Sequence, residues 1–284
     1  MKAALAGLLL VACGPPAGDD GPPADSACTH GAPGLPTNVG TIGAPSNELS
    51  GLIASATTAD LLYTHADAGN AAAIYAIDAR NANLLGTLRV ANATNVDWED
   101  LTRAPCEDGS ACIVIADTGD NLLNRASVRF YAIPDRAPPA GVSQDVTATI
   151  RDVTYPDGAH DVEAVYFDPR DGELYGIDKV DTPDPVVWRY PRAQAMAVEV
   201  TRLDLSAFAG DRRVTSADMH VDACGVQLLV RTADHLLAYG ADFTAPQSVP
   251  VADEPRGEAV AWQVDGGGYY TVSEVANVLF HVSR

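Results

Sequence analysis

Residues 163–190, EAVYFDPRDGELYGIDKVDTPDPVVWRY, carry the pattern that decides the fold. An apolar stretch follows Glu163, a turn containing Pro and Gly interrupts it, and two further apolar stretches begin at Leu174 and Val187. The stretches are short and rich in β-branched and aromatic residues, and Asp, Gly and Pro fill the segments between them. This alternation predicts three consecutive β-strands joined by turns.

The same phrase recurs along the chain. Its openings are Glu48-Leu49-Ser50-Gly51, Glu99-Asp100-Leu101, Glu163-Ala164-Val165, Ala217-Asp218-Met219 and Glu258-Ala259-Val260. A second and a third apolar strand follow each opening, and the spacing of roughly 40 to 65 residues is typical of four-stranded propeller blades. We therefore expect an all-β β-propeller of five four-stranded blades, or of six if the long second unit hides another blade.

The last repeat ends at Arg284 after three strands. Because a propeller must close its ring, we expect an N-terminal strand at residues 38–42 to supply the missing outer strand of this unit. The propeller domain then covers residues 37–284.

The N-terminus has the features of an export signal. Lys2 is followed by a short apolar run, residues 3–11, and then by Ala12 and Cys13. The run is too short to span a bilayer, which takes about 20 apolar residues in a helix. Residues 10–13, LVAC, resemble the lipobox of bacterial lipoproteins, which implies cleavage before Cys13 and acylation of that residue. The alternative is an ordinary signal peptide with an incidental Cys.

These features divide the chain into three parts. Residues 1–12 are expected to be a lipoprotein signal peptide, and residues 13–36, rich in Pro, Gly and Asp, a flexible tether to the propeller. Lipid on Cys13 would anchor the exported protein, which we expect to be a monomer, to the periplasmic or cell-surface face of a bacterial membrane.

The four other cysteines are expected to form disulfides, because an exported chain meets an oxidising compartment. Cys106 and Cys112 flank a turn-forming Glu-Asp-Gly-Ser segment and are well placed for a bridge. Cys28 and Cys224 then remain as the second pair. A zinc site is the alternative, but the spacing lacks the paired short Cys motifs of such sites.

The formal net charge is -20, and the few basic residues do not form a run. Nucleic acid and anionic lipid headgroups require a basic patch, so the composition argues against both as direct partners. An acidic surface often means only solubility. It also suits Ca²⁺, which prefers clustered carboxylate and carbonyl oxygens.

Antiparallel pairing places the start of each inner strand beside the end of the second strand, so these positions gather at one mouth of the central channel. The inner-strand starts supply Glu48, Glu99, Asp100, Glu163, Asp218 and Glu258; the second-strand ends supply Asp67, Asp117, Asp178, Lys179, Arg231, Thr232, Ser273 and Glu274. Crowded carboxylates must be paired, protonated or bridged by a cation. We therefore expect a divalent metal, calcium first, held among Glu99, Glu163, Glu258, Asp117 and Asp218.

Two loops repeat each other, residues 65–70 (HADAGN) and 116–121 (ADTGDN). Their Asp and Asn oxygens suit either calcium ligation or a self-stabilised turn, and the sequence leaves both open. His160 and His65 precede mouth carboxylates and are candidate general bases, and His220 follows Asp218; a hydrogen-bonded structural role is the alternative for each.

Several phrases resemble a family of exported bacterial β-propeller lipoproteins of unassigned function: residues 96–101 (VDWEDL), 116–121 (ADTGDN), 155–164 (YPDGAHDVEA), 229–232 (LVRT) and 257–260 (GEAV). The likeness spans nearly all of the mature domain and implies the fold but no agreed activity. More distantly, the arrangement is similar to phytase-like and lactonase-type propellers, which hold a divalent ion at the channel mouth. Ala217 stands where the other repeats have Glu, and the asparagines typical of lactonases are not evident.

Two functions are consistent with this set of residues. The first is a membrane-anchored propeller that binds a small-molecule or protein ligand at the acidic, metal-containing mouth, with some of the charges acting as salt bridges between blades. The second is a metal-dependent hydrolase of phosphate esters or lactones, in which Lys179 and Arg231 hold an anionic part of the substrate and His160 or Glu274 transfers the proton.

Overall fold

The computed structural model describes residues 31–44 and 48–284, and every one of them lies in a strand, turn or loop. Because these ranges contain no helix, they include none that is long and apolar enough to cross a membrane.

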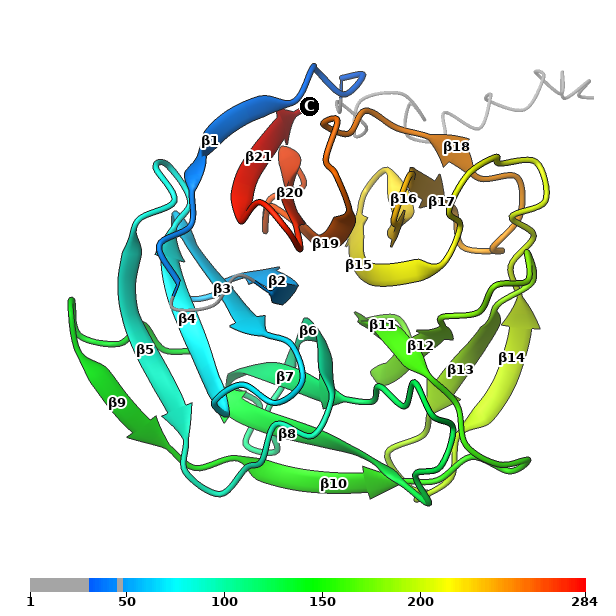
Figure 1. Ribbon diagram of the computed structural model, residues 1–284, viewed down its shortest axis with the longest axis horizontal. Helices are drawn as coiled ribbons and strands as arrows, with labels where there is room; N and C mark the ends of the chain where they lie inside the picture. Colours follow the sequence, from blue (N-terminus) through cyan, green and yellow to red (C-terminus); the bar gives the residue numbers. More distant parts are fainter. Residues whose placement is uncertain (1–30, 45–47) are drawn as a thin grey trace, which may run out of the picture.

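Five sheets surround a common axis in the described part of the chain, so the predicted five-bladed propeller is confirmed (Figure 1). From the inside outward, blade 1 contains β2 (Leu49–Ala54), β3 (Leu61–Ala66), β4 (Ala73–Asp78) and β5 (Leu84–Val90). Blade 2 contains β6 (Trp98–Pro105), β7 (Ala111–Asp117), β8 (Val128–Pro134) and β10 (Thr149–Val153). Blade 3 contains β11 (Val162–Asp168), β12 (Glu173–Asp178), β13 (Val186–Tyr190) and β14 (Val198–Arg202).

The last two blades follow the same order. Blade 4 contains β15 (Val214–Asp222), β16 (Gly225–Thr232), β17 (Leu236–Tyr239) and β18 (Gln247–Ser248). Blade 5 contains β19 (Gly257–Trp262), β20 (Gly268–Ser273), β21 (Val278–Ser283) and β1 (Thr37–Thr41). Blade 5 therefore combines the C-terminal end of the chain with an N-terminal strand.

The ring closes as predicted from the sequence. Strand β1 pairs antiparallel with β21, and Thr41 lies opposite Val278. Two backbone hydrogen bonds extend the pairing beyond the strand, from Gly34 N to Ser283 O (2.7 Å) and from Ile42 N to Asn277 O (2.8 Å). The N-terminal strand thus covers an edge that would otherwise present unpaired backbone groups.

The long second repeat contains one extra strand and does not form a sixth blade. After β8 the chain crosses to blade 1, where β9 (Ser143–Val146) pairs in parallel with β5. It then returns, and β10 completes blade 2 against β8. Blade 1 is consequently five-stranded, which departs from the uniform four strands that the sequence pattern predicted.

Buried side chains join each blade to the next. Alternate residues of a strand face opposite neighbours, so Leu174 packs between blades 2 and 3, whereas the adjacent Tyr175 packs between blades 3 and 4. Trp98 and Trp262 fill the interfaces of blades 1 with 2 and 4 with 5. With both faces covered, these strands contain runs of consecutive apolar residues.

The inner strands contact one another in a closed circle, in the order β2, β6, β11, β15, β19 and back to β2. Their edge N–H groups need acceptors, and side chains of neighbouring strands supply them. Asp100 accepts the N–H groups of Val165 (2.9 Å) and Ala217 (3.1 Å), and Asp218 accepts that of Trp262 (2.8 Å). These two acids of the predicted mouth set therefore fix inner strands to one another.

The predicted Cys106–Cys112 disulfide is present and closes the turn between β6 and β7. The second predicted bridge requires Cys28, and the predicted acylation requires Cys13; both cysteines lie outside the described residues, as does the signal sequence.

Candidate functional site

A β-bulge at the start of each inner strand positions the site. The pairing register shifts at Glu99, Glu163, Thr215 and Glu258 in blades 2 to 5, and at Ser50 and Gly51 in blade 1. A bulge leaves one residue out of the regular alternation and redirects its side chain. The bulged side chains of blades 2 to 5 all line one cavity.

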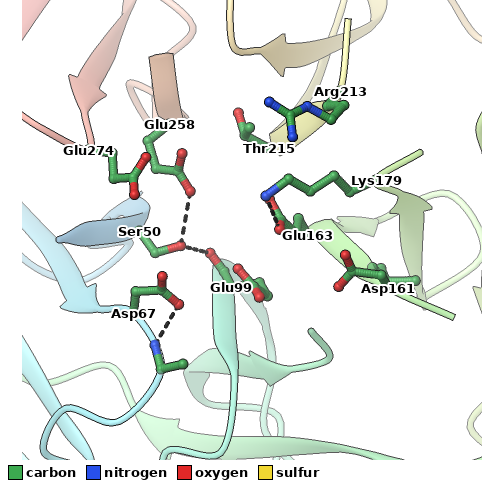
Figure 2. Close-up of polar contacts among 12 residues, drawn as sticks. Ser50, Asp67, Glu99, Asp161, Glu163, Lys179, Arg213, Thr215, Glu258 and Glu274 are labelled. Atoms are coloured by element: carbon green, nitrogen blue, oxygen red, sulfur yellow. Dashed lines mark hydrogen bonds and ion pairs between the residues drawn. The ribbon is translucent and has the colours of Figure 1, made fainter. Parts of the chain in front are cut away.

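This mouth cavity has a volume of about 200 Å³ and is lined by Asp67, Glu99, Asn121, Glu163, Lys179, Arg213, Thr215, Ala233, Arg256, Glu258 and Glu274. Five of these residues are acidic and three are basic. Figure 2 shows the labelled side chains converging from all five blades. The predicted gathering of distant acids at one opening is therefore present.

Burial makes the three glutamates of the cavity costly to ionise. Glu99, Glu163 and Glu258 are only 4%, 2% and 8% exposed. Burial, followed by the charge of Glu163, raises the pKa of both Glu99 and Glu258 well above the ordinary range. Burial also raises the pKa of Glu163, although the Lys179 ammonium opposes this rise. These carboxylates need a cation to remain charged together.

Among the described residues, two groups of three carboxylates could hold such a cation. We call them the Asp67 group (Asp67, Asp97 and Glu99) and the Glu163 group (Glu99, Asp161 and Glu163). In each group, one oxygen from every member lies within 4.8 Å of the others. Two oxygens bound to the same Ca²⁺ at about 2.4 Å can be up to about 4.8 Å apart, so the spacing suits one ion per group.

Gly119 allows the Asp67 group to form. A β-carbon on Gly119 would lie 1.9 Å from Glu99 Oε1 and 2.6 Å from Asp97 Oδ2. The two carboxylates thus occupy space that any other residue would fill. Gly119 N also donates to Asp97 O at 3.2 Å, which ties this turn to the start of the inner strand.

The basic residues of the cavity are each paired. Lys179 Nζ forms an ion pair with Glu163 Oε1 (Figure 2). Arg256 pairs with Glu274 at 2.7 Å, and Arg213 pairs with Asp211 beside the cavity. Glu163 Oε2, in contrast, is buried and has no hydrogen-bond partner among the described residues.

Charge is distributed unevenly around the mouth. The residues two positions before each bulge are Glu48, Asp97 and Asp161 in blades 1 to 3, but Arg213 and Arg256 in blades 4 and 5. One side of the mouth can therefore hold a cation, and the other can attract an anion.

Five of the predicted site residues lie together at the mouth cavity. Glu99, Glu163, Glu258, Lys179 and Glu274 all line the mouth cavity. Only Glu99 and Glu163 of these belong to the two carboxylate groups. Glu258 faces the same cavity, and the Ser50 hydroxyl lies 3.5 Å from its Oε1.

Asp117 and Asp218, predicted as metal ligands, belong to neither group. Asp117 pairs with Arg125 at 2.9 Å and accepts the Asp97 N–H at 3.1 Å. It therefore holds the backbone of Asp97, a candidate metal ligand, in place. Asp218 pairs with Arg103 at 3.2 Å, three residues beyond the bulge. The predicted alignment, which placed Ala217 with the bulged glutamates and Asp218 with Asp100, was wrong, because Thr215 holds the bulged position in blade 4.

Arg231 and His160, predicted to act on a substrate, have structural partners. Arg231 is buried against Glu254, at 2.7 Å, and neither side chain faces the mouth cavity. His160 lies between Asp178 (3.1 Å) and Asp157 (3.0 Å), with its ring 4.5 Å from that of Trp188. Neither Arg231 nor His160 lines the mouth cavity, so the structure does not bring these two predicted residues to the site.

The two repeated loops each contribute one residue to the mouth cavity, Asp67 and Asn121. In residues 116–121, Asp120 accepts the N–H groups of Asn124 and Arg125, and Thr118 Oγ1 donates to Val162 O, so the loop is a turn braced against blade 3. In residues 65–70, Asp67 faces the cavity and His65 is buried. His65 is therefore not accessible as a general base. Like His160, it makes contacts within the fold.

Asp97, Asp161, Arg213 and Arg256 were missed as site residues. Asp97 and Asp161 each stand two residues before a bulged glutamate, in the pattern Asp-x-Glu. That shared spacing was the available signal. The arginines occupy the same position in blades 4 and 5, where the acid is replaced.

In comparisons with known proteins, no family model and no curated protein matches this chain. The functional inferences below rest on the fold and on the mouth cavity.

Proposed function

We propose that this protein is an exported, lipid-anchored β-propeller that binds a divalent cation, Ca²⁺ in the first instance, and through it a ligand at the mouth cavity. The observation that carries the proposal is the pair of carboxylate groups sharing Glu99, both partly or fully buried. Oxygen-only ligands favour a hard cation such as Ca²⁺. The lipobox-like residues 10–13 support the anchor and membership of the exported propeller lipoproteins.

The chemistry of the described residues favours binding. An ion would neutralise carboxylates that burial otherwise drives toward protonation, and Arg213 and Arg256 would attract the anionic part of a small-molecule or protein ligand from the opposite side. Lys179 and Glu274 would orient that ligand. Asp97, supported by Asp117, would keep the ion near blade 2.

The test is metal analysis of the purified protein, followed by calcium and chelator titration of its melting temperature. We expect bound calcium, a rise in melting temperature with calcium, and loss of both in Glu99→Gln, the change that removes the negative charge of the one carboxylate that both groups share. Glu274→Gln is the matched control, because Glu274 lines the cavity outside both groups. A wild-type protein without metal and without a melting shift would refute the proposal.

A second candidate function is a metal-dependent hydrolase of phosphate esters or lactones at the same cavity. The three basic side chains beside the carboxylates support it, since they could stabilise an anionic substrate. Because His160 does not line the mouth cavity and Glu274 does, Glu274 is the remaining predicted candidate for proton transfer. Hydrolysis of generic phosphate-ester and lactone substrates that requires calcium and disappears in Glu99→Gln would establish this activity.

A further inference from the structure

Lys179 has an unusual place in this protein. It and Lys2 are the two lysines of a chain that otherwise uses arginine for its basic residues. Lys179 lies at the mouth cavity, paired with a member of the Glu163 group. Lysine differs from arginine in carrying a compact point charge on a flexible four-carbon chain. Its ammonium can therefore occupy a position suited to a metal ion, and the side chain can also rotate out of that position.

We propose that Lys179 is a built-in occupant of the Glu163 group, and that a divalent cation displaces it on binding. The inference rests on the proposed function, whose regulation it describes. Without an ion, the ammonium neutralises Glu163; with an ion, Lys179 leaves that carboxylate and becomes available to an anionic ligand.

The two partners are unequally free to move. The Lys179 side chain is 24% exposed, whereas that of Glu163 is 2% exposed. Lys179 can therefore swing toward solvent, but Glu163 must stay in the cavity. An exchange consequently moves the lysine and leaves the carboxylate group intact.

Glu163 also has an unused binding position. Its Oε1 contacts Lys179, while its buried Oε2 has no hydrogen-bond partner among the described residues. A buried carboxylate oxygen without a partner is costly, and an ion shared with Glu99 and Asp161 would satisfy it. The ion and the ammonium would then share one carboxylate and repel each other, which drives the exchange.

The electrostatic surroundings agree with this view of Lys179. Burial disfavours its charged form, yet the Glu163 carboxylate, followed by Glu258 and Glu99, holds its pKa above the usual range. The ammonium thus interacts with several carboxylates at once, as a bound cation would.

The first test is calorimetric titration of the full chain with CaCl₂, comparing wild type, Lys179→Met and Arg256→Met. Arg256 lines the same cavity but pairs with Glu274, outside both groups, so it controls for the loss of one positive charge. We expect Lys179→Met to bind calcium at least about tenfold more tightly, or to bind one additional ion, and Arg256→Met to change the affinity by less than about threefold.

The second test uses the wild type and needs no variant. Amine acetylation at a fixed pH, mapped by mass spectrometry, should rise at Lys179 when calcium is added to the folded protein. It should be unaffected by calcium in a denatured sample of the same protein, which is the reference. Calcium binding with unchanged Lys179 labelling and equal affinity in Lys179→Met would overturn the exchange but leave the proposed function intact. Absence of calcium binding in wild type and variant would overturn both.

Discussion

Acidification should destabilise the propeller through one buried histidine, His65. Its ring is fully buried, Nε2 accepts the Gly51 N–H at 3.2 Å, and Nδ1 donates to Ala66 O at 3.0 Å, which requires the neutral form. Burial lowers its pKa to about 4, although the bond to Ala66 opposes the change. Protonation would break the bond that fixes the bulge of blade 1, next to Ser50 at the mouth.

The sign and size follow from proton linkage. Between pH 6.5 and pH 4, His65 is protonated in the unfolded chain but stays neutral in the folded protein. The free energy of unfolding therefore falls as the pH falls. At about 1.36 kcal/mol per pH unit, a pKa lowered from about 6.5 to about 4 corresponds to about 3.4 kcal/mol in total. The contribution is fully present above pH 6.5.

Urea unfolding of wild type and His65→Gln between pH 7 and pH 4 measures this quantity. Glutamine can still accept the Gly51 N–H but does not titrate, and all carboxylates titrate in both proteins. The difference in unfolding free energy, wild type minus variant, should fall by about 1.4 kcal/mol per pH unit and reach about 3 kcal/mol below its neutral value by pH 4. A difference that does not change with pH would refute the reasoning.

Two further predictions concern the carboxylate groups. Burial, followed by the charge of Asp67, raises the pKa of Asp97 to about 6, so calcium affinity should fall by up to about tenfold per pH unit below pH 6 as the ion must displace a proton. Titrations at pH 7 and pH 5 check this, and equal affinities would contradict it. Gly119→Ala should weaken calcium binding at least about tenfold, because the new methyl group overlaps Glu99 Oε1. Gly43→Ala, where an added β-carbon meets nothing within 4 Å, is the control and should bind normally.

Much of the fold could be predicted because strand alternation and repeat spacing are local properties. The missing fourth strand of the last repeat, together with the need to close a ring, correctly placed an outer strand near residues 38–42. The extra strand β9 was not predictable in this way. It pairs in parallel with a strand of the previous blade, and no turn or repeat marks such a long-range partner.

The candidate site was predicted in part. Glu99, Glu163 and Glu258 follow from their place at the start of inner strands, which ring geometry brings together. Asp218 was misplaced because the phrase around Ala217 was aligned two residues out of register with the bulge at Thr215. Position along a strand indicates which end of the ring a side chain occupies, but a bulge decides which residue turns inward.

The sequence by itself favoured five blades over six and predicted the ring closure and the bridge between Cys106 and Cys112, since each depends on strand periodicity or on short separations along the chain. Only the tertiary structure decided which charges are free to act. Arg231 and His160 are held by Glu254 and Asp178, whereas Glu163 keeps one buried oxygen without a partner among the described residues. Pairing of charges depends on distances of a few ångströms between different elements, and sequence patterns do not carry those distances.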